Sequence, residues 1–336
     1  MIAAEPGGAE SARRSFELVA VARRSGLDES WHEGAVVGLA ADGAVAFAVG
    51  DPHVVIYPRS CNKPLQAAAM LRVGLDLPPD LLAVVCASHT GEPEHVAAVR
   101  MILASAGLDE SALGNTPDFP IDELAAADVV RSGGRREPVF MNCSGKHAGM
   151  LVTCRHNDWP TNGSYLDPRH PLQVGIGEVI AELAGETPSH VGVDGCGAPA
   201  HAMSLVGLAR AFRSVAGGEP RVWEAMTGYP DLIGGRGHHV TQLMEGVPGL
   251  LAKDGAEGVY AAVMPDGRAV ALKIADGSSR ARLPVMAAAL TMLGVDVSGA
   301  SAAWRVAVLG HGSPVGEVRA VGALGEAYAR LTSSGR

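Results

Sequence analysis

The sequence predicts an α/β protein in which strands from both ends of the chain form a central, mostly antiparallel sheet, while the middle portion is helical. Two observations support this fold class. Short apolar runs joined by Asp-Gly turns stand near both ends of the 336 residues, a pattern typical of β-hairpins. Between them, apolar residues recur at the spacing of amphipathic helices. We therefore expect a single α/β unit with helices on the faces of the sheet.

The first elements are three strand-like runs that follow a Gly-, Ala-, Glu- and Arg-rich start. Residues 1–15 show no sustained period and are predicted to be a flexible tail. The pair Asp42-Gly43 joins the second run to the third and predicts an antiparallel meander. A helix is expected from about Ser60, with Gly74 at its end. The three runs are Glu17–Ala22, Ala35–Ala40 and Ala44–Val49.

The remaining elements follow from the same signals. A second hairpin is expected around Asp266-Gly267, followed by the helix Arg282–Leu293 and a last strand, Arg305–Leu309. The sequence contains no internal repeat or long linker, so residues 16–336 are predicted to form a single domain with a helical middle portion. The strands of the second hairpin are Gly258–Met264 and Ala269–Ile274, and the middle helices are Glu92–Ala106, Lys146–Asn157, Pro171–Leu183 and Ala198–Ala216.

Composition excludes several classes of protein. Apolar residues make up 47% of the chain and charged residues 19%, which is unlike a disordered protein. The formal net charge of −9 gives no basic surface for phosphates, so no nucleic-acid partner is expected. The apolar run Leu283–Val295 is too short to span a bilayer, so no membrane partner is expected either. The start of the chain lacks the pattern of a secretory signal, which predicts a cytoplasmic location.

Ser60 and Lys63 form the first candidate for catalysis. Side chains three residues apart share a helix face, with about 5–6 Å between their Cβ atoms, so the amine can reach the hydroxyl. A serine becomes nucleophilic when a neighbouring base takes its proton, and lysine serves as that base when its own pKa is lowered. The alternative is an N-cap serine followed by a surface lysine, which is the commoner origin of this spacing.

A second polar segment, with Ser88, His89, Thr90 and Glu92, directly follows the apolar run Leu81–Cys86. Hydroxyls, an imidazole and a carboxylate are concentrated here just before a predicted helix. Such loops often carry catalytic or binding residues. The alternative is that these residues cap the helix, with a hydroxyl at the N-cap and a carboxylate in the first turn. The two interpretations are about equally consistent with the sequence.

The cysteines suggest a metal site. Five cysteines in a long chain are an odd number, which favours reduced thiols or metal ligands over a disulfide framework. Cys143 with His147, and Asp194 with Cys196, provide sulfur, nitrogen and oxygen donors that suit four-coordinate zinc. The spacing is not that of a zinc finger. The alternative is that the cysteines are small buried hydrophobic residues.

Several segments together resemble the rhizobial-type, class 3 L-asparaginase family in their residues, order and spacing. The similarity extends from about residue 17 to the C-terminus and so covers nearly the whole chain. It implies a fold like that of serine β-lactamases and glutaminases, and a catalytic role for the domain. The segments are Tyr57–Gln66, Cys86–Glu92, Asn142–Met150, Asp194–Pro199, Gly255–Tyr260 and Ala271–Ile274.

The resemblance implies hydrolysis of L-asparagine to L-aspartate and ammonia, with L-asparagine as the small-molecule substrate. By position, Ser60 with Lys63 matches one catalytic pair of the family, and Ser88 with Lys273 matches a second. We expect Ser60 to attack the side-chain amide carbon, giving an acyl-enzyme that water hydrolyses. Ser88 and Lys273 would relay protons to the leaving nitrogen.

The same resemblance implies zinc as cofactor and a homodimer. A lysine ligand is unusual, because its amine must lose a proton before it binds a metal. The zinc ligands by position are Cys143, Lys146, Asp194 and Cys196, and the residues predicted to bind substrate are Arg59, His89, Glu92, Asn142 and His147.

One segment departs from the family. Relatives tend to carry Thr-Gly-Arg-Phe where this chain has Arg236-Gly237-His238-His239, within the altered segment Arg236–Gln242. An arginine there would suit the α-carboxylate of the substrate, so the change predicts altered substrate affinity or identity. Two alternatives therefore stay open: an acyl-serine hydrolase acting on glutamine, a β-lactam or a peptide, and a catalytically silent zinc-binding protein.

Overall fold

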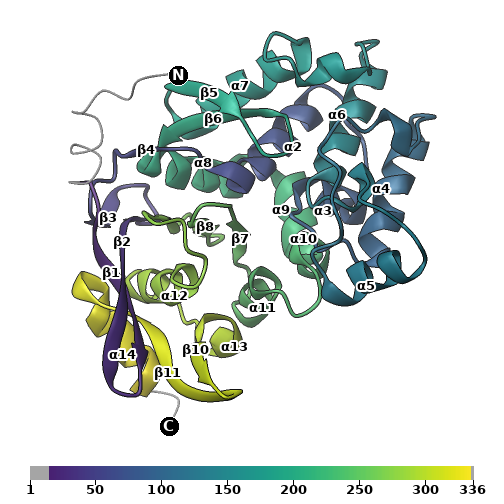
Figure 1. Cartoon of the computed structure of the whole chain (residues 1–336). Coiled ribbons are helices and arrows are strands. Elements are labelled where there is room, and N and C mark those ends of the chain that lie inside the picture. Colours follow the sequence, from purple (N-terminus) through teal and green to yellow (C-terminus); the bar gives the residue numbers. More distant parts are fainter. Residues whose placement is uncertain (1–14, 334–336) are drawn as a thin grey trace, which may run out of the picture. The chain divides into compact units, whose positions relative to one another are not determined.

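The computed structural model describes residues 15–333, so the predicted tail lies outside the described residues except for Ser15. The chain forms two compact units (Figure 1). Among the described residues, the first comprises 15–61, 203–213 and 242–333, and the second comprises 62–202 and 214–241. The prediction of one domain over residues 16–336 is not tested by this division and stays a prediction.

The first unit is built on an eight-stranded antiparallel sheet, in the order β10-β11-β1-β2-β9-β8-β7 with β3 beside β2. As predicted, strands from both ends of the chain join it. Its strands are β1 (Glu17–Arg24), β2 (Leu27–Leu39), β3 (Val45–Val49), β7 (Leu251–Asp254), β8 (Val259–Val263), β9 (Ala269–Ile274), β10 (Val306–Gly310) and β11 (Ser313–Ala320).

The predicted hairpins fix the register of this sheet. Gly43 adopts a positive φ of 91°, and the Asp42 carboxylate accepts a hydrogen bond from Ala44 N–H, so β2 turns directly into β3. In the middle of the sheet, Ala35 of β2 and Val259 of β8 lie opposite Lys273 of β9. The sheet therefore places this predicted catalytic lysine between two neighbouring strands.

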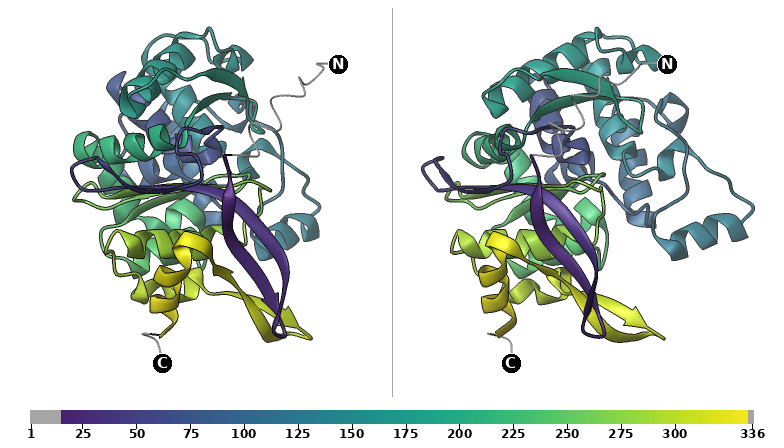
Figure 2. Two further views of the ribbon diagram at one scale, coloured as in Figure 1. Left: turned by 90° about the vertical axis from the view of Figure 1, so that its left-hand side faces the viewer. Right: turned by 60° about the vertical axis from the view of Figure 1, so that its left-hand side comes forward.

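Helices cover one face of the sheet. Helix α12 (Arg282–Met292) contacts β1, β2, β8, β9 and β11, and α14 (Gly325–Ser333) contacts β11 and α12 (Figure 2). The shorter elements are β4 (Val55–Ile56), η1 (Arg59–Asn62), η5 (Ser298–Ala300), α13 (Ser301–Trp304) and η6 (Gly322–Leu324). The observed architecture confirms the predicted class, an α/β fold with an antiparallel sheet.

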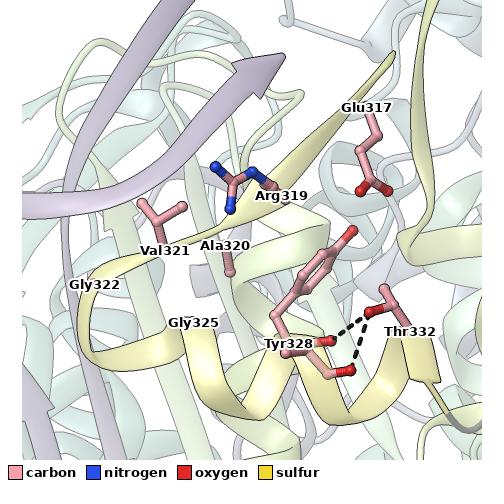
Figure 3. A pocket seen from close by; sticks show the side chains of 9 residues that line it. Glu317, Arg319, Ala320, Val321, Gly322, Gly325, Tyr328 and Thr332 are labelled. Carbon is pink, nitrogen blue, oxygen red and sulfur yellow. Dashed lines mark hydrogen bonds between the residues drawn. The ribbon is translucent and has the colours of Figure 1, made fainter. Parts of the chain in front are cut away.

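The C-terminal elements β11 and α14 were not predicted. The turn between β10 and β11 uses His311 and Gly312, both at positive φ, and His-Gly lacks the Asn or Asp that marks such turns in sequences. Figure 3 shows Tyr328 of α14 facing Glu317 and Arg319 of β11 across a cavity of about 330 Å³. The Tyr328 hydroxyl donates to Val318 O at 3.3 Å, which ties the helix to the sheet.

The second unit is mainly helical, as predicted for the middle of the chain. Its helix α3 is buried and packs against α2, α4, α6, α9 and α10. The helices are α2 (Lys63–Arg72), α3 (Pro79–Cys86), α4 (Pro93–Ser105), α5 (Glu123–Arg131), α6 (Ser144–His156), α7 (Pro171–Ala184), α9 (Pro220–Gly228) and α10 (Pro230–Gly234), with short turns η2 (Glu110–Ala112), η3 (Pro138–Phe140) and η4 (Gly163–Leu166). Helices α8 (Leu205–Gly218) and α11 (His239–Gly246) each contain a boundary between the units.

A close approach of α6 to α3 requires glycine. A Cβ at Gly145 would lie 2.2 Å from Val84 O, and one at Gly149 would lie 2.9 Å from Val85, distances that side chains do not tolerate. Lys146 stands between these glycines on the same buried helix. The glycines thus bring the start of α6 against the end of α3, from which Ser88 follows.

The predicted helix Ala198–Ala216 is wrong in its first part. Strand β6 (Pro199–Ser204) occupies these residues, and its His201 pairs with Val191 of β5 (His190–Val193). All six residues of β6 are buried, and a fully buried strand shows no alternation that distinguishes it from a buried helix. The helix begins only at Leu205.

No helix within residues 15–333 combines the length and hydropathy needed to cross a membrane.

Candidate active site

Lys63 and Ser88 are in direct contact in the second unit. The Lys63 side chain is 2% exposed, and its Nζ lies 3.0 Å from Ser88 Oγ. It also donates to Ala87 O at 2.5 Å and to Asn142 O at 3.2 Å. The start of α2, the end of α3 and the segment before α6 therefore meet at one buried amine. Sequence analysis did not predict this contact, because it paired Ser88 with Lys273.

The contacts of Lys63 with two carbonyl groups and one hydroxyl indicate what its amine can do. The two carbonyl oxygens only accept hydrogen bonds, whereas a hydroxyl can either donate or accept. A neutral amine can therefore donate to Ala87 O and Asn142 O and direct its lone pair at Ser88 O–H. The protonated amine can donate to all three. The arrangement thus suits a base that takes a proton and keeps its position afterwards.

The loop that starts at Ser88 is bonded to the residues just before the altered segment Arg236–Gln242. Ser88 N–H donates to Ile233 O at 3.0 Å, and Thr90 N–H donates to Gly234 O at 3.0 Å. At Gly235, with φ of 124°, a Cβ would lie 2.1 Å from Thr90 Oγ1. The residues immediately before the altered segment therefore pack directly on the loop that carries Ser88.

Glu92, a predicted substrate-binding residue, holds this packing together. Its carboxylate accepts hydrogen bonds from the Thr90 hydroxyl at 3.1 Å and from Arg236 N–H at 3.1 Å. The Arg236 side chain is exposed and forms an ion pair with Glu94. Thr90, which belongs to the polar segment identified in the sequence, and Gly235 thus position this loop. Arg236, the first residue of the altered segment, is linked to the loop through the Glu92 carboxylate.

His89 and His95 form a buried pair beside Ser88. Their rings stack with centroids 5.1 Å apart. His89 Nε2 lies 2.9 Å from Ser144 Oγ, whose hydroxyl donates to Val139 O at 2.8 Å. The serine oxygen therefore accepts from His89, which places the imidazole proton on Nε2. Burial holds the pKa of His89 well below 6.5, and the charges of the neighbouring His95 and Lys63 lower it further. Burial also lowers the pKa of His95.

These two histidines predict acid sensitivity of the fold. Because their pKa values are lower in the folded than in the unfolded chain, the unfolded chain binds more protons below pH 6.5. Stability is thus fully present above pH 6.5 and is lost as the pH falls. We expect the free energy of unfolding, measured by urea denaturation, to drop by on the order of 2 kcal/mol between pH 7 and pH 5. His89→Gln should show a shallower decline, and an unchanged pH slope in that variant would contradict the assignment.

The predicted metal ligands Cys143, Lys146 and Cys196 also meet in the second unit. Cys143 precedes α6, Lys146 lies in its first turn, and Cys196 stands in the turn after β5. Lys146 Nζ lies 3.1 Å from Cys196 Sγ. A hydrogen bond from Cys196 holds the pKa of the Cys143 thiol well below its usual value, although burial alone would raise it. The charges of Lys63 and Lys146 lower this pKa further. The cluster therefore favours a thiolate at Cys143.

The sulfurs and the amine of this cluster are donor types that zinc accepts, whereas Cys143, Asp194 and Cys196 do not place all their ligand atoms within 4.8 Å of one another. Two buried cysteine sulfurs and the Lys146 amine converge, and Asp194 is close enough for its charge to raise the pKa of Lys146. Burial alone would lower that pKa, but the cysteine charges raise it, so binding a metal requires Lys146 to release a proton. Gly197 N–H donates to Asp194 O at 2.8 Å. This hydrogen bond closes a turn that positions Cys196.

His147 lies next to this cluster and is fully buried. Its Nδ1 is 2.7 Å from the Tyr165 hydroxyl, which also accepts a hydrogen bond from Gly114 N–H at 3.0 Å. Tyr165 thus links His147 to the backbone of Gly114, and the tautomer of the imidazole decides which of the two groups donates. Burial lowers the pKa of His147 to about 4. Tyr165 was not predicted, because nothing near it in the sequence marks it as a partner of α6.

The remaining predicted residues belong to the first unit. Arg59, immediately before Ser60, has a positive φ of 54°, a strained conformation for a residue with a side chain and one that is common at functional sites. Its guanidinium lies 3.9 Å from Glu257. Lys273 Nζ donates to Glu257 O at 2.5 Å and to Ile274 O at 2.6 Å, and burial lowers its pKa. The predicted pairs Ser60–Lys63 and Ser88–Lys273 each join residues assigned to different units and stay predictions.

Cys61 is an unreactive neighbour of the predicted nucleophile. Its thiol is buried and lies 3.1 Å from Lys253 O. Burial raises its pKa to about 12, so the thiol stays protonated and is a weak nucleophile at neutral pH. Ser60 is therefore the nucleophilic candidate of this turn.

Comparisons with known proteins place the chain in a family. The family described as L-asparaginase II matches residues 20–320. A search of curated protein sequences finds no match. Among solved structures, Mglu in its native form aligns with a TM-score of 0.41 and 16% identity, covering 75% of this chain and 62% of that one. This chain therefore spans less than two thirds of Mglu.

Two further solved structures show similar values. A probable glutaminase, ybaS, aligns with a TM-score of 0.42 and 17% identity over 79% of this chain and 86% of its own. A β-lactamase from Mycobacterium bovis aligns with a TM-score of 0.35 and 16% identity over 73% of this chain and 88% of its own.

Proposed function

The chain belongs to the L-asparaginase II family, and we propose that it hydrolyses L-asparagine to L-aspartate and ammonia through a serine nucleophile. Family membership supports the coarser assignment, an amidohydrolase. The observation that carries the mechanism is the buried Lys63 amine, with its two carbonyl acceptors and the Ser88 hydroxyl at 3.0 Å. A buried amine held in this way is the base that a serine nucleophile requires.

In the proposed reaction, Ser60 Oγ attacks the side-chain amide carbon of asparagine and its proton passes to Lys63 Nζ. The Ser88 hydroxyl, bonded to the same amine, passes its proton to the amide nitrogen and takes the proton held by Lys63, so ammonia leaves, Lys63 is neutral again and an aspartyl ester remains on Ser60. Water then attacks the ester, and the proton it loses returns to Ser60 as aspartate departs.

Lys273 and the predicted substrate-binding residues have supporting roles in this proposal. The lowered pKa of Lys273 favours a neutral amine that can exchange protons with Ser88 and the leaving group. Arg59 is assigned to the substrate carboxylate, since a guanidinium binds carboxylates in a bidentate manner. The resemblance also assigns Asn142, His89, Glu92 and His147 to substrate binding, and we retain this assignment as part of the proposal. A cytoplasmic homodimer remains part of the proposal.

Cys143, Lys146, Asp194 and Cys196 would hold a zinc ion. When bound, the ion supplies positive charge that keeps the thiols deprotonated and joins the start of α6 to the turn after β5. The protein side chains themselves carry out the proton transfers, because a serine nucleophile and an amine base are already present.

The function is tested by incubating purified protein with L-asparagine and, separately, with L-glutamine, and measuring the ammonia released. We expect release from asparagine to exceed release from glutamine at least tenfold. The reverse preference would point to the altered segment Arg236–Gln242 as the origin of a different specificity. No release from either substrate, with zinc bound, would support the silent zinc-binding alternative.

The zinc assignment is tested independently of activity. We expect about one zinc per chain by atomic emission, and Cys196→Ser should lose most of it, because one of the two thiolates is removed. The buried Cys154 gives a matched control: Cys154→Ser lies on the same helix, α6, and should retain zinc. Equal zinc content in both variants would contradict the assignment.

A further inference from the structure

His32 is a buried histidine of the first unit that the proposed reaction does not use. It lies in β2 and is 2% exposed. Its Nδ1 is 2.7 Å from Asp276 Oδ2, in the loop between β9 and α12. Arg280 Nε, in the same loop, donates to His32 Nε2 at 2.9 Å. The imidazole therefore joins a carboxylate on one side to a guanidinium on the other.

These contacts fix the protonation of the His32 ring. A guanidinium has donors only, so Nε2, which accepts from Arg280, carries no proton. The ring proton is then on Nδ1, and it is donated to Asp276 Oδ2. The other oxygen, Asp276 Oδ1, accepts a hydrogen bond from Ser278 N–H at 2.8 Å. A neutral histidine and the loop backbone thus hold one oxygen each of the Asp276 carboxylate.

Asp276 belongs to the turn that binds the Lys273 amine. Gly277, at a positive φ of 77°, donates its N–H to Ile274 O at 3.1 Å and closes the turn 274–277. Lys273 Nζ donates to the same carbonyl oxygen at 2.6 Å. One oxygen therefore holds both the turn and the amine, so a side chain that fixes the turn also fixes the place of the amine.

The charges around Lys273 come from two carboxylates. The residues opposite Lys273 in β2 and β8 are uncharged. Burial lowers the pKa of Lys273, whereas the charges of Glu257 and, to a lesser extent, Asp276 raise it. Glu257 also lies 3.9 Å from the Arg59 guanidinium, which balances part of its charge. Asp276 is bonded to a neutral imidazole instead, so its replacement by asparagine removes a negative charge without breaking a charged pair.

We propose that His32 is a positioning residue for Lys273 and acts through Asp276. The buried ring anchors the turn 274–277 and keeps the Asp276 carboxylate in it, where the negative charge favours the protonated amine. A lysine that relays protons must take up both charge states, and the carboxylate counters the effect of burial. The consequence for catalysis rests on the proposed function, whereas the consequence for the amine is measured without substrate.

The titration of Lys273 is measured by nuclear magnetic resonance on the full chain labelled with [13Cε]lysine. The chain contains four lysines, and the signal absent from Lys273→Arg belongs to Lys273. We expect Asp276→Asn to lower the titration midpoint by on the order of 0.5 pH units, because a negative charge near the amine is removed. His32→Phe should also lower it, because the carboxylate loses its buried anchor. Asp276 is exposed, so its variant is expected to fold.

Asp266 provides a matched control. It lies in the turn at the other end of β9, and its side chain is 47% exposed, against 46% for Asp276. Asp266→Asn removes the same charge and should leave the midpoint of Lys273 unchanged. A midpoint that is equal in wild type and Asp276→Asn, or one that Asp266→Asn lowers as much, would overturn the proposal.

The pH dependence of ammonia release separates this inference from the proposed function. If neutral Lys273 relays protons, Asp276→Asn should move the acid limb of kcat/KM to lower pH by the same amount as the midpoint. A lowered midpoint with an unmoved limb, or with no activity, would support the role of Asp276 and contradict the role of Lys273 in the reaction. An unchanged midpoint in an active enzyme would refute the inference and leave the proposed function standing.

Discussion

Lys63→Met is expected to lower kcat for asparagine at least 10³-fold. Methionine keeps the length of the side chain but removes the amine that contacts Ser88 Oγ, Ala87 O and Asn142 O. The nucleophile then has no base, and two buried carbonyl groups lose a donor. We therefore also expect a loss of stability of about 1–3 kcal/mol. Steady-state ammonia release and urea denaturation measure the two effects.

A variant of a second buried lysine serves as a control that distinguishes an effect on kcat from an effect on stability. Lys253 is also fully buried, and its amine bonds to the Asp254 carboxylate at 2.7 Å. Lys253→Met should destabilise the fold to a similar extent while kcat falls less than tenfold. If both variants lost activity in proportion to their stability, Lys63 would be a structural residue and the proposed mechanism would be wrong.

The sheet was predictable because its turns are encoded locally. Asp42-Gly43 joins β2 to β3 as predicted, since glycine adopts the required positive φ. The turn at His311 and Gly312, where both residues have a positive φ, lacks a typical sequence, so β11 was missed. Strand β6 was missed for a different reason: burial on all sides removes the alternation on which strand prediction depends.

The candidate site was predictable in its residues but not in its contacts. The motifs identified Lys63, Ser88 and Cys196, and each lies in a buried polar cluster in the structure. The bond between Lys63 and Ser88 joins the start of α2 to the segment after α3, and the hydrophobic periodicity of a sequence does not reveal such a contact. Tyr165 lies 18 residues from its partner His147, and sequence spacing alone does not reveal such a long-range hydrogen bond.

Ser60→Ala and Ser88→Ala are expected to lower kcat to different extents, and this difference identifies the nucleophile. Ser60→Ala should lower kcat by about 10⁴-fold or more, because no covalent intermediate can form. Ser88→Ala should lower it by about 10²-fold to 10³-fold, because a proton relay is lost while the nucleophile and base remain. Both side chains are small and partly exposed, so neither change should alter stability by more than about 1 kcal/mol.

Mass spectrometry of the acid-quenched reaction gives the second measurement. We expect the aspartyl ester on the peptide that contains Ser60 in the wild type and in Ser88→Ala, and no ester in Ser60→Ala. The direct bond between Ser88 Oγ and Lys63 Nζ makes the opposite result chemically meaningful. An ester on Ser88 that persists in Ser60→Ala would make Ser88 the nucleophile with Lys63 as its base, and Ser60 would then be the hydroxyl that relays the proton.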